Sequence, residues 1–80
     1  MRAIIRFSLD DDQDGALNGK LRKYLEKRGF KKLPGNTGTY EHRKNTERKL
    51  SFTTRNFWMK ITNHNGPGHI DHFWMYADKA

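Results

Sequence analysis

Four carboxylates lie within five residues near the start of the chain, at Asp10, Asp11, Asp12 and Asp14. They are four of only nine acidic residues in a chain of net charge +7, so the remaining sequence alone carries +11. Because Mg²⁺ prefers oxygen ligands and keeps several of its waters, one or two carboxylates suffice to hold it. Asp10 with Asp12 or Asp14 is therefore a candidate magnesium site, and Asp10 is the candidate catalytic carboxylate.

Two other interpretations of this acidic segment, residues 10–14, stay open. Acidic side chains just before a helix stabilise its dipole by about 0.3–1 kcal/mol each and need no further role. A basic partner could also dock on the segment. The spacing of the carboxylates does not separate helix capping, metal binding and docking.

His42 is a second candidate for acid-base chemistry. The ordinary pKa of histidine lies near neutral pH, so this imidazole could take the proton of a ribose 2'-hydroxyl if an RNA crossed the sheet. A solvated surface histidine is the simpler alternative. We expect no zinc site at His69 and His72, because residues three apart in a strand point to opposite faces.

The chain is strongly basic, with 16 Lys and Arg and a pI of about 10.0. Such a field attracts polyanions, and we expect RNA or DNA as the main partner. Basic residues on one strand, around one hairpin and at one helix start are the candidate phosphate contacts. They are Arg2, Arg6, Lys31, Lys32, Arg43, Lys44, Arg48 and Lys49. Solvated surface charge is the alternative explanation.

The residues before the acidic segment alternate like a half-buried strand. One face of this strand carries Ala3, Ile5, Phe7 and Leu9. Apolar residues at helical spacing then predict a helix over residues 14–28, with Gly29 suited to the left-handed position beyond it. The acidic segment should therefore lie between the end of a strand and the start of a helix.

Turn-forming residues at 34–38 separate two strand-like stretches, 30–33 and 39–43, and predict a hairpin. Residues 46–62 carry apolar side chains at helical spacing, although β-branched residues among them favour a strand. We predict a helix there, capped by residue 45 or 46.

Residues 70–77 are almost wholly apolar, which predicts a last strand covered on both faces. The resulting order of elements is β-α-β-β-α-β, an α+β fold of the ferredoxin-like plan with two helices on one face of an antiparallel sheet. The other face stays open for RNA or for a second subunit. Trp58 and Trp74 should lie in or beside the core, with stacking on bases or on a partner as the alternative, for Trp74 more than for Trp58.

These residues resemble two related families of small proteins. One comprises the CRISPR-associated spacer-acquisition proteins, described as small metal-dependent nucleases, and the other the virulence-associated protein D toxins. The likeness lies in an apolar strand that ends in acid at residues 4–10, a basic helix closing at 27–30, and the sequence Gly38-Thr39-Tyr40-Glu41. The resemblance implies a ferredoxin-like homodimer in which Asp10 of each subunit lies near the dimer axis and holds a divalent ion such as Mg²⁺.

The length of 80 residues predicts a single domain, residues 1–80, whose stability comes from packing because the chain has no cysteine. No window approaches the roughly 20 apolar residues that span a bilayer, so we expect a cytoplasmic protein without a membrane partner. The predicted function is that of a small nucleic-acid-associated protein, in its sharpest form a weak metal-dependent ribonuclease or phosphodiesterase. The alternative is a non-enzymatic protein-binding module or an inhibitor encoded by a mobile element.

Overall fold

The computed structural model describes residues 1–35 and 38–78. The chain forms two helices and four strands in the predicted order. They are β1 (Arg2–Asp10), α1 (Ala16–Lys27), β2 (Lys31–Lys32), β3 (Thr39–His42), α2 (Glu47–Thr62) and β4 (His69–Asp78).

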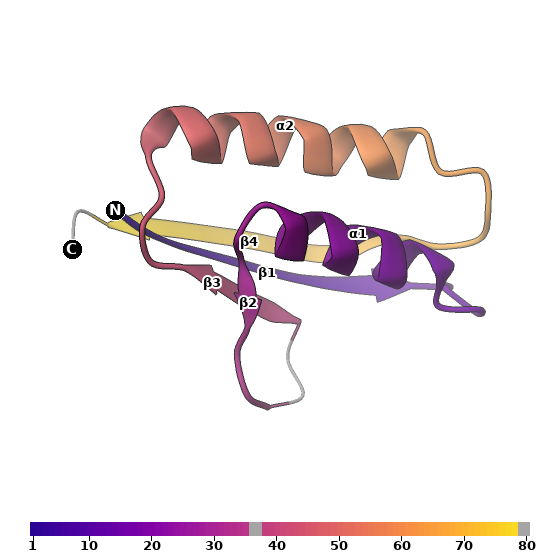
Figure 1. Ribbon diagram of the computed structural model, residues 1–80. Coiled ribbons are helices and arrows are strands. Elements are labelled where there is room, and N and C mark those ends of the chain that lie inside the picture. Colours follow the sequence, from indigo (N-terminus) through magenta and orange to yellow (C-terminus); the bar gives the residue numbers. More distant parts are fainter. Residues whose placement is uncertain (36–37, 79–80) are drawn as a thin grey trace.

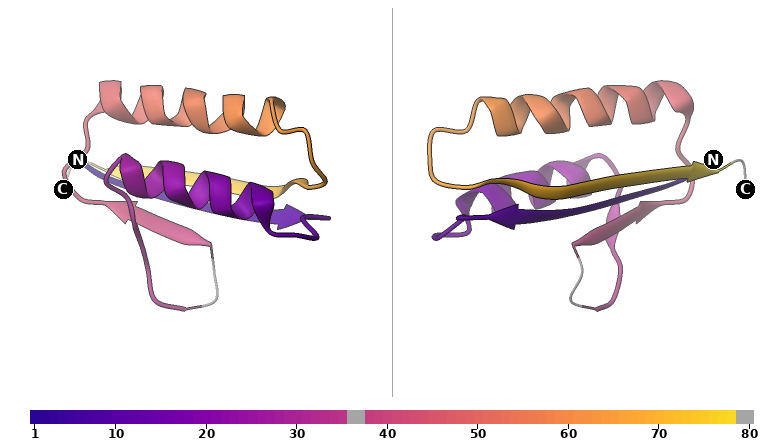
Figure 2. Two further views of the ribbon diagram at one scale, coloured as in Figure 1. Left: turned by 45° about the vertical axis from the view of Figure 1, so that its right-hand side comes forward. Right: turned by 180° about the vertical axis from the view of Figure 1, so that it is seen from behind.

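The strands form one sheet in the order β2-β3-β1-β4, and every neighbouring pair is antiparallel. Each β-α-β unit is split, because β3 lies between β1 and β2, and β1 lies between β3 and β4. Both helices cover the same face of the sheet and leave its other face bare (Figures 1 and 2). The predicted α+β class, with two helices on one face of an antiparallel sheet, is confirmed.

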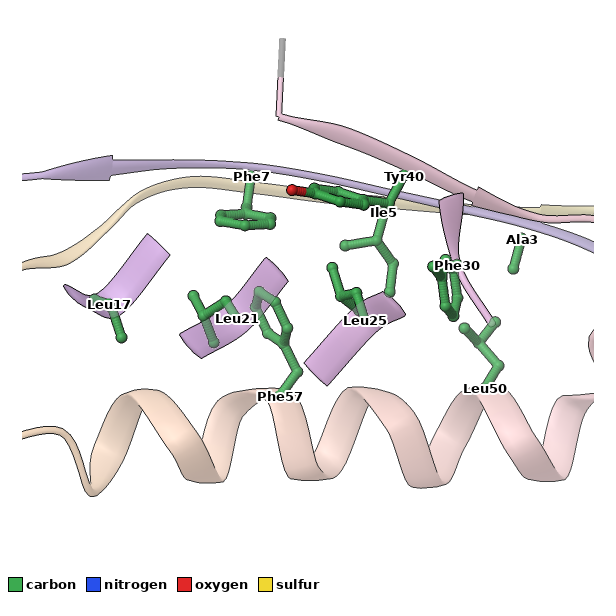
Figure 3. Packing of buried hydrophobic residues seen from close by; sticks show 10 residues of the cluster. All are labelled: Ala3, Ile5, Phe7, Leu17, Leu21, Leu25, Phe30, Tyr40, Leu50 and Phe57. Atoms are coloured by element: carbon green, nitrogen blue, oxygen red, sulfur yellow. The ribbon is translucent and has the colours of Figure 1, made fainter. Parts of the chain in front are cut away.

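The hydrophobic core lies between the sheet and the two helices (Figure 3). Its buried members are Ala3, Ile5, Phe7, Leu17, Leu21, Leu25, Phe30, Tyr40, Leu50 and Phe57. Phe57 of α2 packs edge-on against Phe7 of β1, with ring centroids 5.3 Å apart. Because side chains alternate along a strand, burial of the odd-numbered residues of β1 turns its even-numbered residues toward the bare face.

α2 is a helix, as predicted, and not a strand. Thr46 has extended backbone and its side chain accepts a hydrogen bond from the Lys49 amide, which is N-cap geometry. Leu50, Thr53 and Phe57 recur at helical spacing and are the buried residues of the element. The amphipathic spacing and the cap therefore outweigh the strand preference of the β-branched residues.

β4 corrects one prediction, because this strand is not covered on both faces. It lies at the edge of the sheet and, within residues 1–35 and 38–78, pairs with β1 alone. Trp74 is 51% exposed, and Met75 and Tyr76 are each 42% exposed. The apolar run in the sequence marks a strand that is bare on one face and only partly covered on the other.

The predicted hairpin is present as β2 and β3, although β2 has only two residues. Residues 36 and 37 of the predicted turn lie outside the described part of the chain. Gly29 follows Arg28, the C-cap of α1, and has a φ of 91°, as predicted for the left-handed position. Among residues 1–35 and 38–78, neither helix has the length and apolarity needed to cross a membrane.

Candidate nucleic-acid interface

The face of the sheet opposite the helices, here called the open face, collects aromatic, basic and acid-base side chains. Strand register assigns the side chains to this face, because paired residues of antiparallel strands point the same way. They are Arg2, Ile4, Arg6, Ser8, Asp10, Lys31, Thr39, Glu41, His69, His72, Trp74, Tyr76 and Asp78. The open face therefore includes three of the predicted phosphate contacts, Arg2, Arg6 and Lys31.

Trp74 and Tyr76 stack on each other on the open face. Their ring centroids are 5.9 Å apart and the ring planes differ by only 7°. The two residues are two positions apart in β4, which places them on the same side of the strand. Arg6 pairs with Trp74 in the register and is itself exposed. A flat aromatic surface beside a guanidinium group is the arrangement on which unpaired bases stack.

Glu41 organises the arginines at the β3 side of the open face. Its carboxylate accepts a hydrogen bond from Arg2 Nε at 2.6 Å and another from Arg43 Nε at 3.1 Å. These bonds lower the pKa of Glu41, the bond from Arg2 having the larger effect. The carboxylate is thus held ionised between two predicted phosphate contacts.

The structure brings four of the predicted phosphate contacts together. They line one surface hollow and are Lys31, Lys32, Arg43 and Lys44. Lys31 pairs with Glu41 and so points to the open face, whereas Lys32 pairs with Tyr40 on the helix side. Arg48 and Lys49 lie exposed on the first turn of α2. The basic residues therefore surround one end of the sheet and extend onto both of its faces.

His42 lies on the helix side of the sheet, because it pairs with buried Ala3. Its Nδ1 accepts a hydrogen bond from the Lys44 amide at 3.1 Å, and its ring packs edge-on against Phe30. Burial, followed by the charge of Lys49, lowers the pKa of His42. The imidazole therefore does not face an RNA strand bound on the open face.

The acidic segment starts α1. The two carboxylate oxygens of Asp12 accept hydrogen bonds from the amides of Leu17 and Asn18, at 3.1 Å and 2.9 Å. Asp14 accepts one from the Ala16 amide at 3.1 Å. These contacts are the helix capping that was one of the three interpretations of the segment.

Asp10 makes a different contact from its neighbours, with its Oδ2 3.4 Å from His69 Nε2. Within residues 1–35 and 38–78, no group of three or more His, Asp or Glu side chains is arranged to hold a metal ion. A magnesium site at Asp10 and Asp12 stays a prediction. The two predicted catalytic residues lie far apart, since Asp10 and the β1 partner of His42 are separated by about 23 Å of strand.

A β-bulge in β4 creates a group of polar side chains that sequence reasoning missed. Ser8 pairs with His72 and Leu9 with Ile70, so Asp71 is an extra residue in β4. The Asp71 carboxylate lies 2.9 Å from His72 Nδ1 and 3.4 Å from the Ser8 hydroxyl. The bulge therefore aligns an acid, an imidazole and a hydroxyl on the open face.

The same bulge corrects the expectation that His69 and His72 point to opposite faces. Ile70 and Phe73 both pack against the core although they are three residues apart. The extra residue of the bulge, Asp71, lies between them and shifts the alternation of side chains by one position. Both histidines consequently face away from the helices. The signal in the sequence that could have revealed the bulge was the spacing of three between the apolar residues Ile70 and Phe73, because core residues of a regular strand are two apart.

Comparison of the chain with models of protein families, with curated proteins and with solved structures found no match. The resemblance to the spacer-acquisition and toxin families stays a prediction.

Proposed function

We propose that the protein binds single-stranded nucleic acid on the open face of its sheet. The observation that carries this proposal is the stacked and half-exposed pair of Trp74 and Tyr76. An aromatic ring accepts any base on its face, and each stacked base contributes about 1–3 kcal/mol. Bases would continue the stack that the two rings already form.

Charge supports the same proposal. The chain carries +7, and Arg6 lies next to the aromatic pair with no acidic side chain of the described residues within ion-pair distance. Arg43 follows β3, the strand next to β1, and Lys31 lies in β2, one strand further away; both are near Glu41. Strands are about 4.8 Å apart, so a nucleic-acid strand that crosses the sheet from β4 would reach both basic residues. Cleavage by a metal held at Asp10 would be an additional activity of this bound complex.

The test measures the affinity of a fluorescently labelled single-stranded oligonucleotide by anisotropy. Trp74→Ala should lose about 1–3 kcal/mol of binding free energy, because a stacking surface disappears. Phe52→Ala is the matched control, since Phe52 is 53% exposed but lies on α2, on the other side of the sheet. Wild-type affinity should also fall steeply between about 50 and 200 mM salt. Equal affinities of wild type and Trp74→Ala would refute the proposal.

We also infer that β4 is a contact surface for a second copy of the chain. Its outer edge is unpaired among the described residues, and residues 72–77 include no Lys, Arg or Pro to block edge pairing. Antiparallel pairing centred on Met75 would place Trp74 of one copy opposite Tyr76 of the other. The two open faces would then join into one larger surface, which is compatible with nucleic-acid binding.

Light scattering after size exclusion tests this dimer. Met75→Lys should give a monomer, because two ammonium groups would meet at the centre of the paired edge. Met59→Lys places the same charge at a 49% exposed methionine of α2 and should leave the dimer intact. A wild-type protein that is monomeric at all concentrations would exclude the dimer.

A further inference from the structure

We propose that the open face also cleaves RNA without a metal ion, with His72 as the general base. The inference rests on the proposed function, because it requires a strand of RNA stacked on Trp74. The site is the group of Ser8, Asp71 and His72 that the bulge of β4 aligns beside the aromatic pair.

The contact with Asp71 fixes the orientation of the His72 ring. A carboxylate can only accept hydrogen bonds, so Nδ1 of His72 donates to Asp71 Oδ2 at 2.9 Å. In the neutral imidazole, the other nitrogen, Nε2, then carries the free lone pair. An imidazole that is oriented by a carboxylate and has one free basic nitrogen is the arrangement used for general base catalysis.

The bulge is the structural reason that this contact exists. Neighbouring residues of a regular strand point to opposite faces and their side chains do not meet. At the bulge, Asp71 has no partner of its own in β1, and its side chain contacts both His72 and Ser8 on the open face. Bulges commonly redirect side chains in this way beside active sites.

The surroundings of His72 match the parts of a ribonucleotide. Arg6, Ser8, His72 and Trp74 line the same hollow on the open face. Trp74 offers a surface for the base, and the Arg6 guanidinium can hold the phosphate and stabilise the charge that develops on it. His72 lies in β4 between Trp74 and the start of that strand at His69. The ribose of a nucleotide stacked on Trp74 would lie beside it.

The reaction class is transesterification within the RNA backbone. His72 Nε2 takes the proton of the ribose 2'-hydroxyl, and the 2'-oxygen attacks the neighbouring phosphorus. The new bond from the 2'-oxygen to phosphorus forms as the bond from phosphorus to the 5'-oxygen breaks. The 5'-oxygen leaves with that electron pair and takes a proton from water, while His72 returns its proton to solvent. The products are a 2',3'-cyclic phosphate and a 5'-hydroxyl.

The experiment incubates a single-stranded RNA oligonucleotide with the full chain in excess EDTA and analyses both new ends. Wild type should form the cyclic phosphate from RNA and leave the all-deoxy oligonucleotide intact. His72→Ala should still bind RNA but should cleave it at least about 100-fold more slowly, and added imidazole should restore part of the rate. His64→Ala is the matched control, because His64 is a histidine of the loop before β4 that contacts Lys20 and Pro67.

Asp71 is a positioning residue in this proposal. Asp71→Asn should lower kcat and leave KM and the unfolding midpoint unchanged, because it alters the orientation and proton position of His72 but not RNA binding. RNA that is bound but not cut, or cut equally by His72→Ala, would overturn the inference and leave the proposed function intact. Failure to bind RNA at all would instead overturn the proposed function.

Discussion

Arg2 Nε lies 2.6 Å from Glu41 Oε2 and thereby joins β1 to β3 across the open face. Arg43 donates to the other oxygen of the same carboxylate. One acidic side chain thus neutralises part of the charge of two arginines on a surface that we propose binds a polyanion. Glu41 consequently affects both stability and binding, and in opposite directions.

Glu41 should make folding stability depend on acid pH. The pKa of this carboxyl is lowered from 4.5 in the folded state by the bonds from Arg2 and Arg43. Its contribution to stability is therefore complete above 4.5 and is lost as the pH falls through the lowered folded pKa. Urea titrations from neutral to acid pH should show a weaker loss of stability for Glu41→Gln than for wild type. Parallel pH curves for the two proteins would contradict this assignment.

The same substitution should strengthen the binding of nucleic acid. Glu41→Gln removes a negative charge from the open face and frees Arg2 and Arg43 to contact phosphates. The salt dependence of binding should become steeper, by about one unit for each added phosphate contact. Glu26→Gln removes the same charge from the exposed surface of α1, on the other side of the sheet, and is the control. Equal gains in both variants would point to net charge alone.

The sequence predicted the fold well where a single element determines its own pattern. Alternation in β1 placed Ile5 and Phe7 in the core, and helical spacing placed Leu21 and Phe57 there. The prediction from sequence failed for β4, because apolar residues in a strand do not show whether other elements of the fold cover them. Only the sheet order shows that β4 is an edge strand and that Trp74 faces solvent.

The candidate site was harder to predict than the fold, because its residues meet through pairing between distant strands. Asp10 and His42 each looked suitable for chemistry, but antiparallel pairing places them at opposite ends of β1. Asp71 and His72 are adjacent in the sequence, and the side chains of neighbours in a regular strand point to opposite faces. Their contact depends on a bulge that appears only once the register with Ser8 is known.

Gly38 is expected to be essential for the join between β1 and β3. A Cβ at this position would lie within van der Waals overlap of the Phe7 carbonyl oxygen, which belongs to the backbone and cannot rotate away. The Phe7 amide also donates to the Gly38 carbonyl at 3.0 Å. Gly38→Ala should therefore destabilise the protein by about 1–3 kcal/mol in chemical denaturation.

Gly19→Ala is the matched control for this substitution. Gly19 lies within α1, and a Cβ there would meet no heavy atom within 4 Å. In a helix interior, alanine is more favourable than glycine by about 1 kcal/mol, so this variant should be more stable than wild type. A Gly38→Ala protein that is as stable as wild type would show that the close approach at Gly38 is relieved by movement of the hairpin.

Asp12 distinguishes helix capping from metal binding in the acidic segment. Both of its oxygens accept amide hydrogen bonds from α1, and Asp12→Asn would leave only one acceptor. The loss should be about 1 kcal/mol of unfolding free energy and should be the same with and without Mg²⁺. Asp11→Asn is the control: Asp11 bonds to the Gln13 side chain, and Asn tolerates the φ of 59° found there.

Magnesium gives the opposite result if the segment holds a metal. An ion that binds only the folded state stabilises it by RT ln(1 + c/Kd), where c is the ion concentration, so the unfolding midpoint rises with that concentration. The midpoint of wild type would then rise with added Mg²⁺, and both Asp10→Asn and Asp12→Asn would abolish the rise. Capping instead predicts a midpoint that is insensitive to the ion in all four proteins, with a penalty confined to Asp12→Asn. Because Asp10 makes no bond to α1 in the described chain, loss of the Mg²⁺ response in Asp10→Asn without a loss of stability in the absence of the ion would identify metal binding.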